Sequence, residues 1–550
     1  MWVRNFFASA TPNSMTQGNI QLEAEVAQHV VNGYSTGSFP VNQVPTIHLA
    51  RSVGINTLYQ IGAQLAPALA AIGAIPILLR HLGPEAYGVV TLFSTALIYF
   101  AMLDLGLGRA TTRFVAQSTE NGCSKDVARY FWSSLLLLTG AGLMVGLGFL
   151  FAVPAVVSHF LKIPPAYSRS AIESFYLISV TIPLVTMMAA LRGFLEAAGR
   201  FPFLSAVTAI TGAGMYIVPA IVVVAGGGLV SVAASYVALR VAMTTAFGIG
   251  CLRVKDRPSL RPTLDWDALQ RMVSFGGWLS VSNVIGTAMV YGDRFLLGSF
   301  LGMLAVTSYS MPLDVIGRIQ IVISSFCAVL FPLLSRLDGA DSQRFKPVYR
   351  AAMAFVLSLI TPLAVSAILL SPFLMRLWLR ERTTPEAVFA AQVFLAGSIV
   401  QAMASISFTA LHARGRSDLT AWVHVAEFPL YCGVFFWAAT HFGVRGAALI
   451  WFGRVIVDFA CMVFLLKVQE RTRGLLVTPE LAAILISVLV LITAVVRPAS
   501  TILIGTAICL LTWLWTWRML LDPNLRTRVA SAVTSPVTTF TWILGANRTR

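Results

Sequence analysis

Long apolar runs recur along the whole chain, and they constrain its fold more than any other feature. Each run has about 18 or more residues, which is enough to cross a hydrocarbon core about 30 Å thick. Only 11% of the residues are charged, against about 25% in an average soluble domain. An all-α polytopic membrane protein is therefore expected. Fourteen transmembrane spans are predicted, at 54–79, 87–108, 131–157, 171–190, 203–225, 228–252, 272–299, 304–334, 347–374, 386–411, 418–440, 444–466, 480–496 and 499–517.

The positive charges are distributed unevenly between the two sides of these spans. The formal net charge is +16, with 39 Lys and Arg residues. If the N-terminus lies inside, and Arg350 and Arg445 at span ends are counted with the adjacent loops, 27 of them fall in inner segments, 8 in outer loops and 4 within spans. Short loops rich in Lys and Arg stay in the cytoplasm, so this distribution predicts that both termini are cytoplasmic. The basic composition then reflects topology, and no nucleic-acid partner is expected.

The chain also contains an internal repeat at an interval of about 216 residues. Leu-Glu-Ala-Ala-Gly-Arg at 195–200 matches Leu-His-Ala-Arg-Gly-Arg at 411–416. The repeated unit would hold six helices, and because six is even, both copies enter the membrane in the same direction. Two six-helix lobes related by a parallel pseudo-twofold axis are therefore expected, with two added C-terminal helices. Further pairs at nearly this interval are Leu82-Gly83 with Leu301-Gly302, Gly227 with Gly443, and Arg240 with Arg454.

This repeat predicts how the chain is divided. The substrate path of the protein should lie between the two lobes, where rocking of one lobe against the other opens the path to one side of the membrane at a time. The predicted parts are a polar cytoplasmic tail at 1–50, an N-terminal lobe at 51–252, a cytoplasmic linker at 253–271, a C-terminal lobe at 272–470, spans thirteen and fourteen within 471–519, and a cytoplasmic tail at 520–550.

Short outer loops and missing motifs argue against an enzyme. The longest predicted outer loop is 158–170, whereas membrane polymerases and ligases for glycans generally present catalytic groups in a large exterior loop. The sequence has no Walker A or H-E-x-x-H motif, and its six cysteines are scattered. No catalytic residue, metal site or cofactor is predicted.

Ionisable residues inside the predicted spans are the candidates for function, because burying them in a membrane is costly. A guanidinium offers a planar set of donors that suits a pyrophosphate headgroup. Asp314 with Arg318, and Arg454 with Asp458, are spaced as i, i+4 pairs, so a structural ion pair is the alternative interpretation. The predicted substrate-binding residues are Arg240, Arg294, Arg318 and Arg454, and the predicted ion-coupling or orienting residues are Asp104, Asp293, Asp314, His424, Glu427 and Asp458.

Two of these predictions differ in their basis. Arg240 and Arg294 have no acidic residue four positions away, which favours them for substrate contact. His424 and Glu427 are spaced i, i+3 and can both change protonation state, so they are a candidate for proton coupling. A satisfied interior polar pair is the alternative for these two residues.

Three local sequences resemble the polysaccharide transporter family, the Wzx-type O-antigen and exopolysaccharide flippases of the superfamily that also contains MATE exporters. They are Leu-Arg-His-Leu-Gly-Pro-Glu-Ala-Tyr-Gly at 79–88, Asp-Leu-Gly-Leu-Gly-Arg-Ala at 104–110 and Tyr-Gly-Asp-Arg-Phe-Leu-Leu-Gly at 291–298. The similarity covers roughly 51–470. It implies a two-lobed, V-shaped fold with a central cavity, in the inner membrane of a bacterium.

The resemblance also implies a function. Its substrate would be an undecaprenyl-pyrophosphate-linked oligosaccharide, flipped from the cytoplasmic to the periplasmic leaflet for O-antigen, exopolysaccharide or capsule synthesis. H⁺ or Na⁺ is a possible coupling ion, and membrane lipids and polysaccharide polymerase or assembly proteins are possible partners. The alternatives are a cation-coupled MATE-type exporter of small molecules, a lipid II flippase and, less favoured, a membrane glycan polymerase or ligase.

Overall fold

A computed structural model describes residues 46–104, 106–254, 262–337, 342–470, 479–496, 505–511 and 514. The chain divides into two units, Met1–Ile55 and Asn56–Arg550. In the first unit only residues 46–55 are described, and they form the first turns of α3 (Thr46–Leu82). Most of the predicted N-terminal tail, all of the predicted C-terminal tail and most of the fourteenth span lie outside the described residues.

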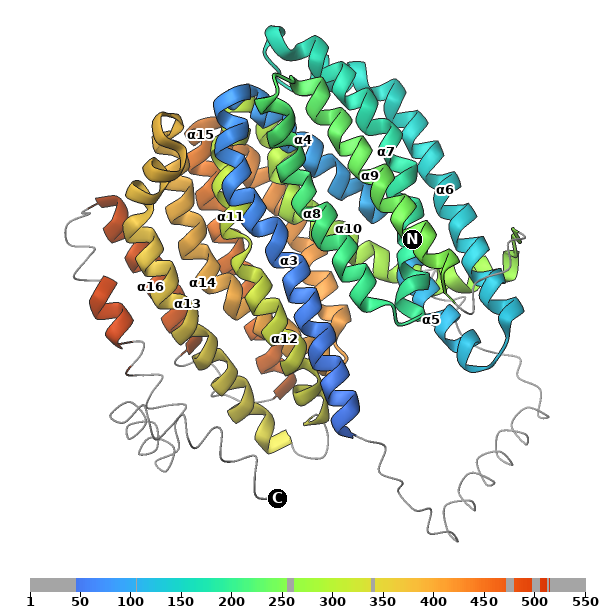
Figure 1. The fold of residues 1–550 in the computed structure, drawn as a ribbon. Helices are drawn as coiled ribbons and strands as arrows, with labels where there is room; N and C mark the ends of the chain where they lie inside the picture. Colours follow the sequence, from blue (N-terminus) through green and yellow to red (C-terminus); the bar gives the residue numbers. More distant parts are fainter. Residues whose placement is uncertain are drawn as a thin grey trace, which may run out of the picture. The chain divides into compact units, whose positions relative to one another are not determined.

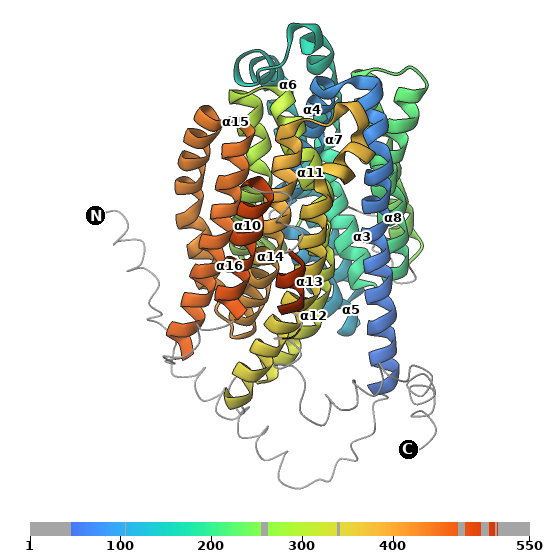
Figure 2. The same cartoon turned by 90° about the vertical axis from the view of Figure 1, so that its left-hand side faces the viewer.

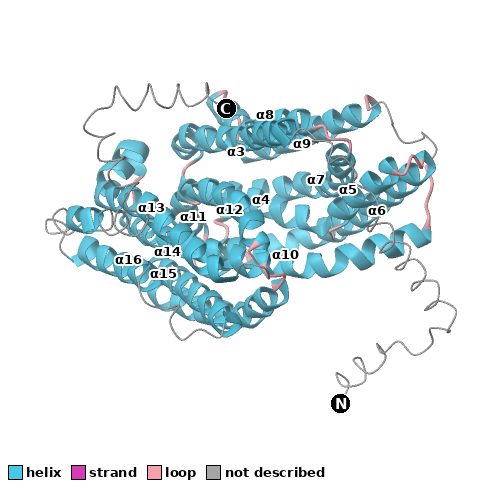
Figure 3. Ribbon diagram, turned by 90° about the horizontal axis from the view of Figure 1, so that it is seen from below, coloured by secondary structure: helices cyan, strands magenta, loops and turns pink. Residues whose placement is uncertain are grey.

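All the elements in the described part of the chain are helices (Figure 3). Helices are expected here because they pair their own backbone N–H and C=O groups, which lipid cannot do. In the second unit the chain first forms α4 (Pro84–Ala101), η1 (Met102–Asp104), α5 (Leu107–Glu120), α6 (Ser124–Ala155), η2 (Val156–Phe160), α7 (Pro165–Ala197), α8 (Phe201–Val224) and α9 (Leu229–Leu252).

The later helices contain two breaks, and the sequence predicted one of them. The predicted eighth span is two helices, bent by 41° where one ends and the next begins. The boundary predicted between the eleventh and twelfth spans coincides with Gly443, whose φ of 63° and ψ of −146° interrupt the element that runs from 417 to 470. These helices are α10 (Trp266–Phe300), α11 (Met303–Ile316), α12 (Ile319–Arg336), α13 (Ser342–Leu379), η3 (Arg380–Arg382), α14 (Pro385–Ala413), α15 (Ser417–Glu470) and α16 (Pro479–Val496).

Many of these helices are suited to a membrane. Eight are long and apolar enough to cross one, and nine if α11 and α12 count as a single bent span. One of the eight, Ser417–Val468 of α15, has 52 residues, about twice the roughly 20 that a single crossing needs. Gly443 divides it into two legs, and Arg454 on the second leg lies over the ring of Tyr431 on the first. The legs therefore pack side by side, and the chain is a multi-pass membrane protein.

The described helices of the second unit pack in two groups (Figures 1 and 2). In the first, here called the α7 group, α7 contacts α4, α5, α6, α8 and α9. In the second, the α14 group, α14 contacts α11, α12, α13, α15 and α16. Helix α10 joins the groups, because it contacts α4, α5 and α6 as well as α11 and α15. It begins at Trp266, inside the predicted linker, and its Ala268 and Met272 are buried in the core of the α7 group.

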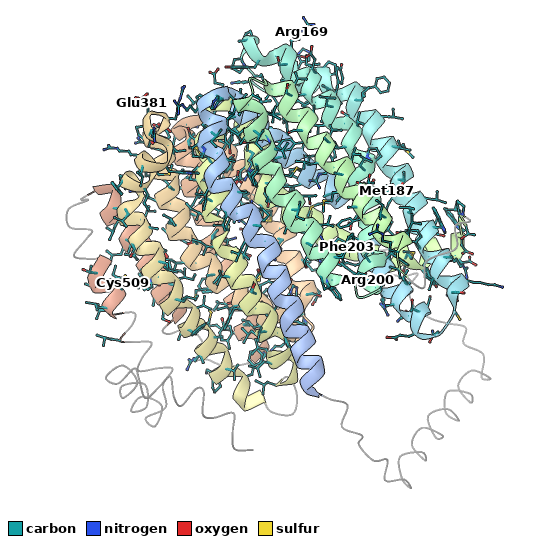
Figure 4. The ribbon with its side chains drawn as sticks, viewed as in Figure 1. Arg169, Met187, Arg200, Phe203, Glu381 and Cys509 are labelled. Atoms are coloured by element: carbon teal, nitrogen blue, oxygen red, sulfur yellow. The ribbon has the colours of Figure 1, made fainter. Side chains whose placement is uncertain are left out.

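Two ends of this helical assembly can be distinguished. The Gly302 end holds the turns at Gly83, Gly302 and Arg380, which are linked by hydrogen bonds from Thr307 to Pro84 and between Ser308 and Thr384. The Gly415 end holds the turns that follow α7 and α14. Gly83 and Gly302, from the predicted repeat, have φ 83° and 86°, a left-handed conformation that favours glycine. Figure 4 labels Arg169 and Glu381 at the Gly302 end and Arg200 away from it.

Candidate functional site

A cavity of about 500 Å³ lies between the α7 group and the α14 group. Helices α3, α4, α8 and α9 line one side of it, and α10, α11, α12, α14 and α15 line the other. Three arginines and one aspartate face this central cavity, so its charged side chains are formally positive. Its polar lining consists of Gln64, Tyr87, Thr91, Ser94, Tyr216, Tyr236, Tyr291, Arg294, Asp314, Arg318, Gln320, Gln401, Trp451 and Arg454.

Arg294 holds the wall of the cavity together. It lies on α10 with only 3% of its surface exposed, and its guanidinium forms an ion pair with Asp314 on α11. A second nitrogen, Nη1, donates to Thr95 Oγ1 on α4 at 3.3 Å. The side chain therefore bridges the two helix groups. Removing either partner of this buried ion pair would leave an uncompensated charge, so the two side chains depend on each other.

Arg318 lies at the break between α11 and α12, where the backbone leaves the regular helix after Gly317. Its Nη2 donates to Tyr216 Oη on α8 at 2.8 Å. Its Nε donates to the main-chain oxygen of Asp314 at 3.3 Å, so the carboxylate is left for Arg294. The predicted i, i+4 ion pair between Asp314 and Arg318 is therefore replaced by contacts that reach across the cavity.

Arg454 is the least constrained of the three cavity arginines. It lies on the second leg of α15, with its guanidinium 5.4 Å from the centre of the Tyr431 ring. Its Nε is buried and has no hydrogen-bond partner among the described residues. Behind it, Tyr431 donates to Asp293 Oδ1 at 2.7 Å, and Tyr309 donates to Asp293 Oδ2 at 2.6 Å. Asp293 is 1% exposed and orients the wall rather than facing the cavity.

The other predicted acids of α15, Glu427 on its first leg and Asp458 on its second, do not line the central cavity. His424 Nε2 lies 3.3 Å from Asp458 Oδ1 across the hairpin, without a hydrogen bond between them, and no ion pair joins Asp458 to Arg454 among the described residues. Both carboxylate oxygens of Glu427 are buried without a hydrogen-bond partner in the described part of the chain. His424 and Glu427 are therefore not a hydrogen-bonded pair in this structure, which leaves out the alternative of a satisfied polar pair.

Arg240 and Asp104 lie elsewhere, in a separate cavity of about 440 Å³ inside the α7 group. This Arg240 cavity also receives Arg109, Arg192 and Glu196. Glu196 is paired with Arg192 at 2.8 Å, and Asp104 Oδ1 accepts from the backbone N–H of Gly106 at 3.0 Å. The structure thus brings together three of the four predicted arginines and sets Arg240 apart.

Sequence reasoning missed the uncharged part of the site. Four tyrosines line the central cavity, at Tyr87, Tyr216, Tyr236 and Tyr291, and only ionisable residues with an ordinary charge at neutral pH were considered. Tyrosines within apolar spans were a usable signal, because their hydroxyl groups need a polar partner when buried.

No group of three or more His, Cys, Asp or Glu residues in the described ranges could hold a metal ion.

Hydrogen bonds join the two groups at the Gly302 end. Lys162 donates its backbone N–H to the oxygen of Gly298 at 2.9 Å and its Nζ to the oxygen of Phe300 at 2.8 Å. Thr307 Oγ1 donates to the oxygen of Pro84 at 2.5 Å. These bonds join α10 and α11 to the turns that begin α7 and α4.

Comparison with known proteins identifies the family. A family model described as "Polysaccharide biosynthesis protein" matches residues 77–385, more than half of the chain. The chain belongs to this polysaccharide biosynthesis family. A curated relative from Shigella flexneri, named "Putative O-antigen transporter", is 27% identical over 404 residues, covering 73% of this chain and 95% of that protein. The matched region includes α4 to α13, which contribute Arg294, Asp314 and Arg318 to the central cavity.

Solved structures with low sequence identity share the fold. "Lipid II flippase MurJ, inward closed conformation" aligns with TM-score 0.63 and 13% identity, covering 84% of this chain and 97% of that one. An inward-facing multidrug resistance MATE family transporter of the MOP superfamily aligns with TM-score 0.61 and 14% identity, covering 76% and 96%. The MATE-like fold expected from the sequence is therefore confirmed.

Proposed function

We propose that this protein is a flippase for lipid-linked oligosaccharides in polysaccharide biosynthesis, and that the central cavity holds the phosphate groups of the substrate. The observation that carries the proposal is the surplus of guanidinium groups in a cavity between two helix groups. Arg294, Arg318 and Arg454 face a single carboxylate there, so the cavity attracts an anion. Family membership and the O-antigen transporter relative favour a glycan carried on a lipid.

The finer parts of the proposal follow from the sequence. The positive-inside rule places the Gly302 end at the periplasmic face of a bacterial inner membrane, with both termini in the cytoplasm. The carrier would be undecaprenyl pyrophosphate, with about fourteen spans forming two lobes, 51–252 and 272–470, around a pseudo-twofold axis. The bonds that join the two groups at the Gly302 end would then break as the lobes rock, so that the cavity opens to the periplasm.

Ion coupling is a separate part of the proposal. His424, Glu427 and Asp458 lie between the legs of α15, beside Arg454 on the same hairpin, so a bound H⁺ or Na⁺ can alter the cavity wall through that leg. Glu427→Gln removes the titratable group and keeps the shape. We expect this variant to flip substrate at a rate that no longer responds to an imposed proton or sodium gradient. Full gradient dependence in the variant would place coupling elsewhere, with Asp104, Asp293 and Asp314 as the remaining candidates.

The experiment that tests the function uses cells in which the gene is deleted. Complementation with the wild type should restore surface polysaccharide and prevent lipid-linked repeat units from accumulating in the cytoplasmic leaflet. Arg318→Gln at the wild-type protein level should restore neither, because it removes a cavity cation. Arg169→Gln is the matched control, since Arg169 is exposed and pairs with Glu173 at the Gly302 end. Normal polysaccharide in the deleted strain would contradict the proposed function.

Two other transport functions remain as outcomes of the same experiment. An exporter of cationic drugs would place carboxylates in the central cavity, whereas this cavity holds one aspartate and three arginines. Altered drug sensitivity with normal polysaccharide would nevertheless favour it. A lipid II flippase would use the same pyrophosphate chemistry, and rescue of a strain that lacks its own lipid II flippase would favour that substrate.

A further inference from the structure

A second basic cleft lies at the Gly302 end, apart from the central cavity. It has a volume of about 520 Å³ and lies between the end of α13, η3, the start of α14, the second leg of α15 and Ala494 on α16. None of its lining residues lines the central cavity. Three arginines, Arg376, Arg380 and Arg445, face this Arg380 cleft, with Glu381 as the only acid in its lining.

Two of these arginines are available to a ligand. Among the described residues, neither Arg376 nor Arg380 has an ion pair or a side-chain hydrogen bond, and both side chains are exposed. Arg445 has an ion pair with Glu386 at 3.6 Å, but both side chains are about half exposed, so the pair contributes little. The guanidinium of Arg445 lies 5.7 Å from the centre of the Phe389 ring, which holds it beside the cleft.

The backbone of the cleft is held in an unusual conformation. Arg380 has φ 52°, and no other non-glycine residue in the described ranges has a positive φ. This left-handed conformation is unfavourable for a residue with a side chain. It allows α13 to end and η3 to turn toward α14, so that Arg376 and Arg380 border the same cleft. Thr384 accepts from the backbone N–H of Ala387 at 3.2 Å and caps the start of α14.

An uncharged polar side chain also lines the cleft. Gln392, on the second turn of α14, is 8% exposed and lines the Arg380 cleft. No hydrogen bond with any described residue uses its side chain, and its amide atoms are not among the fully buried ones that lack a partner. The amide is therefore available to a ligand that enters the cleft. It would donate an N–H to an oxygen that the arginines also contact.

We propose that the Arg380 cleft binds a phosphate group, and that this phosphate belongs to an anionic phospholipid in the adjacent leaflet. The three guanidinium groups and the Gln392 amide suit phosphate oxygens. Phe389 and Ala494 provide an apolar wall next to α16, where the glycerol and first methylene groups of a lipid can pack. This site does not depend on the transported substrate, because the cleft shares no residue with the central cavity.

Binding is tested with purified full-length protein in nanodiscs of zwitterionic lipid, titrated with phosphatidylglycerol and followed by native mass spectrometry. Arg380→Gly is the sharpest variant, because glycine keeps the left-handed backbone and only the guanidinium is lost. We expect Arg380→Gly and Arg376→Gln each to weaken binding about tenfold. Arg169→Gln, an exposed arginine at the same end, should change it less than twofold.

Two further arms identify the source of the phosphate and separate this site from the central cavity. Competition by millimolar inorganic phosphate, lost in the same variants, would support the phosphate chemistry. Binding of inorganic phosphate alone would support the site and assign it to a soluble phosphate-bearing ligand. Arg454→Gln should leave phosphatidylglycerol binding unchanged. Equal binding of lipid and phosphate by the wild type, Arg380→Gly and Arg376→Gln would overturn the proposal.

Discussion

The central cavity and the Arg240 cavity contain the same kinds of side chain but differ in their place in the fold. Both receive three arginines, and both lie next to apolar helices. The Arg240 cavity lies within the α7 group and balances its arginines with two acids, one of them already paired with Arg192. The central cavity lies between the groups and offers one carboxylate to three cations. A buried arginine is therefore a candidate for substrate binding when it faces the other helix group.

Arg294→Ala should have the largest effect, and it tests whether Arg294 in the central cavity joins the two helix groups. The substitution leaves Asp314 without its partner and removes the bridge from α10 to Thr95. Breaking a buried ion pair costs about 3–5 kcal/mol, so we expect a large drop in the melting temperature of the purified protein and loss of surface polysaccharide. Asp314→Ala should be similarly harmful. A melting temperature equal to that of the wild type would show that the bridge is not structural.

Arg454→Gln should affect binding more than stability, because Arg454 has no ion pair in the described part of the chain. We expect the affinity for a lipid diphosphate to fall about tenfold, as lost charged hydrogen bonds of about 1.5–3 kcal/mol imply. Equilibrium binding of a fluorescent polyprenyl diphosphate to the purified protein measures this loss. Arg454→Lys keeps the charge and should retain part of the affinity. Full affinity in Arg454→Gln would remove this arginine from the site.

Arg240→Gln tests whether the Arg240 cavity differs from the central cavity in substrate binding. Arg240 faces the Arg240 cavity and not the central cavity, so we expect binding of the same lipid diphosphate to change less than twofold. The folded amount of the variant, measured by fluorescence-detected size-exclusion chromatography, serves as its control. A tenfold loss of binding at a wild-type folded amount would mean that Arg240 contacts the substrate, as the sequence predicted.

The smallest expected effect lies outside both cavities, at the start of α10. Asp265 accepts from the Ala268 N–H at 2.9 Å and forms an ion pair with Arg129 at 2.6 Å. The hydrogen bond from Arg129 is the main cause that lowers the pKa of Asp265 below its usual value. A lowered folded-state pKa stabilises the protein above the unfolded-state value of about 3.9. This stabilisation is lost as the pH falls through the folded-state pKa.

Thermal melts between about pH 3 and pH 6 measure this effect, with Asp265→Asn as the matched variant. Asparagine keeps the N-cap but neither titrates nor pairs with Arg129. The variant should therefore melt slightly lower than the wild type near pH 6, and the difference should shrink below pH 4. A constant difference over this range would contradict the assignment of the ion pair.

The helical membrane fold was predictable from the sequence, because apolar run length acts directly on membrane insertion. The break at Gly443 was predictable too, since two spans were expected on either side of it. The break between α11 and α12 was not. Pairing of Asp314 with Arg318 assumed a continuous helix, but the helix ends at Ile316 and Arg318 turns toward Tyr216. For Arg454 and Asp458 the i, i+4 ion pair was the alternative interpretation, and the structure instead places His424 Nε2 3.3 Å from Asp458 Oδ1.

The candidate site was predictable only in part, for a related reason. Residue spacing identifies charged side chains within spans, but it does not tell which neighbouring helices each span faces. Arg240 was placed with Arg294, Arg318 and Arg454 because it lies within a span and has no acidic residue four positions away, but α9 carries it into the α7 group instead. The Arg380 cleft depends on one left-handed residue at the end of α13, which the sequence pattern does not reveal.

The central claim is that cations between the two helix groups carry the phosphate of a lipid-linked glycan across the membrane. It is tested most directly by flipping of a fluorescent diphosphate-linked oligosaccharide lipid in proteoliposomes, with wild-type protein, Arg454→Gln and Arg240→Gln at equal reconstituted amounts. The account predicts flipping by the wild type and by Arg240→Gln, and at least tenfold slower flipping by Arg454→Gln. Equal rates for Arg454→Gln and the wild type, or no flipping by any of the three, would contradict it.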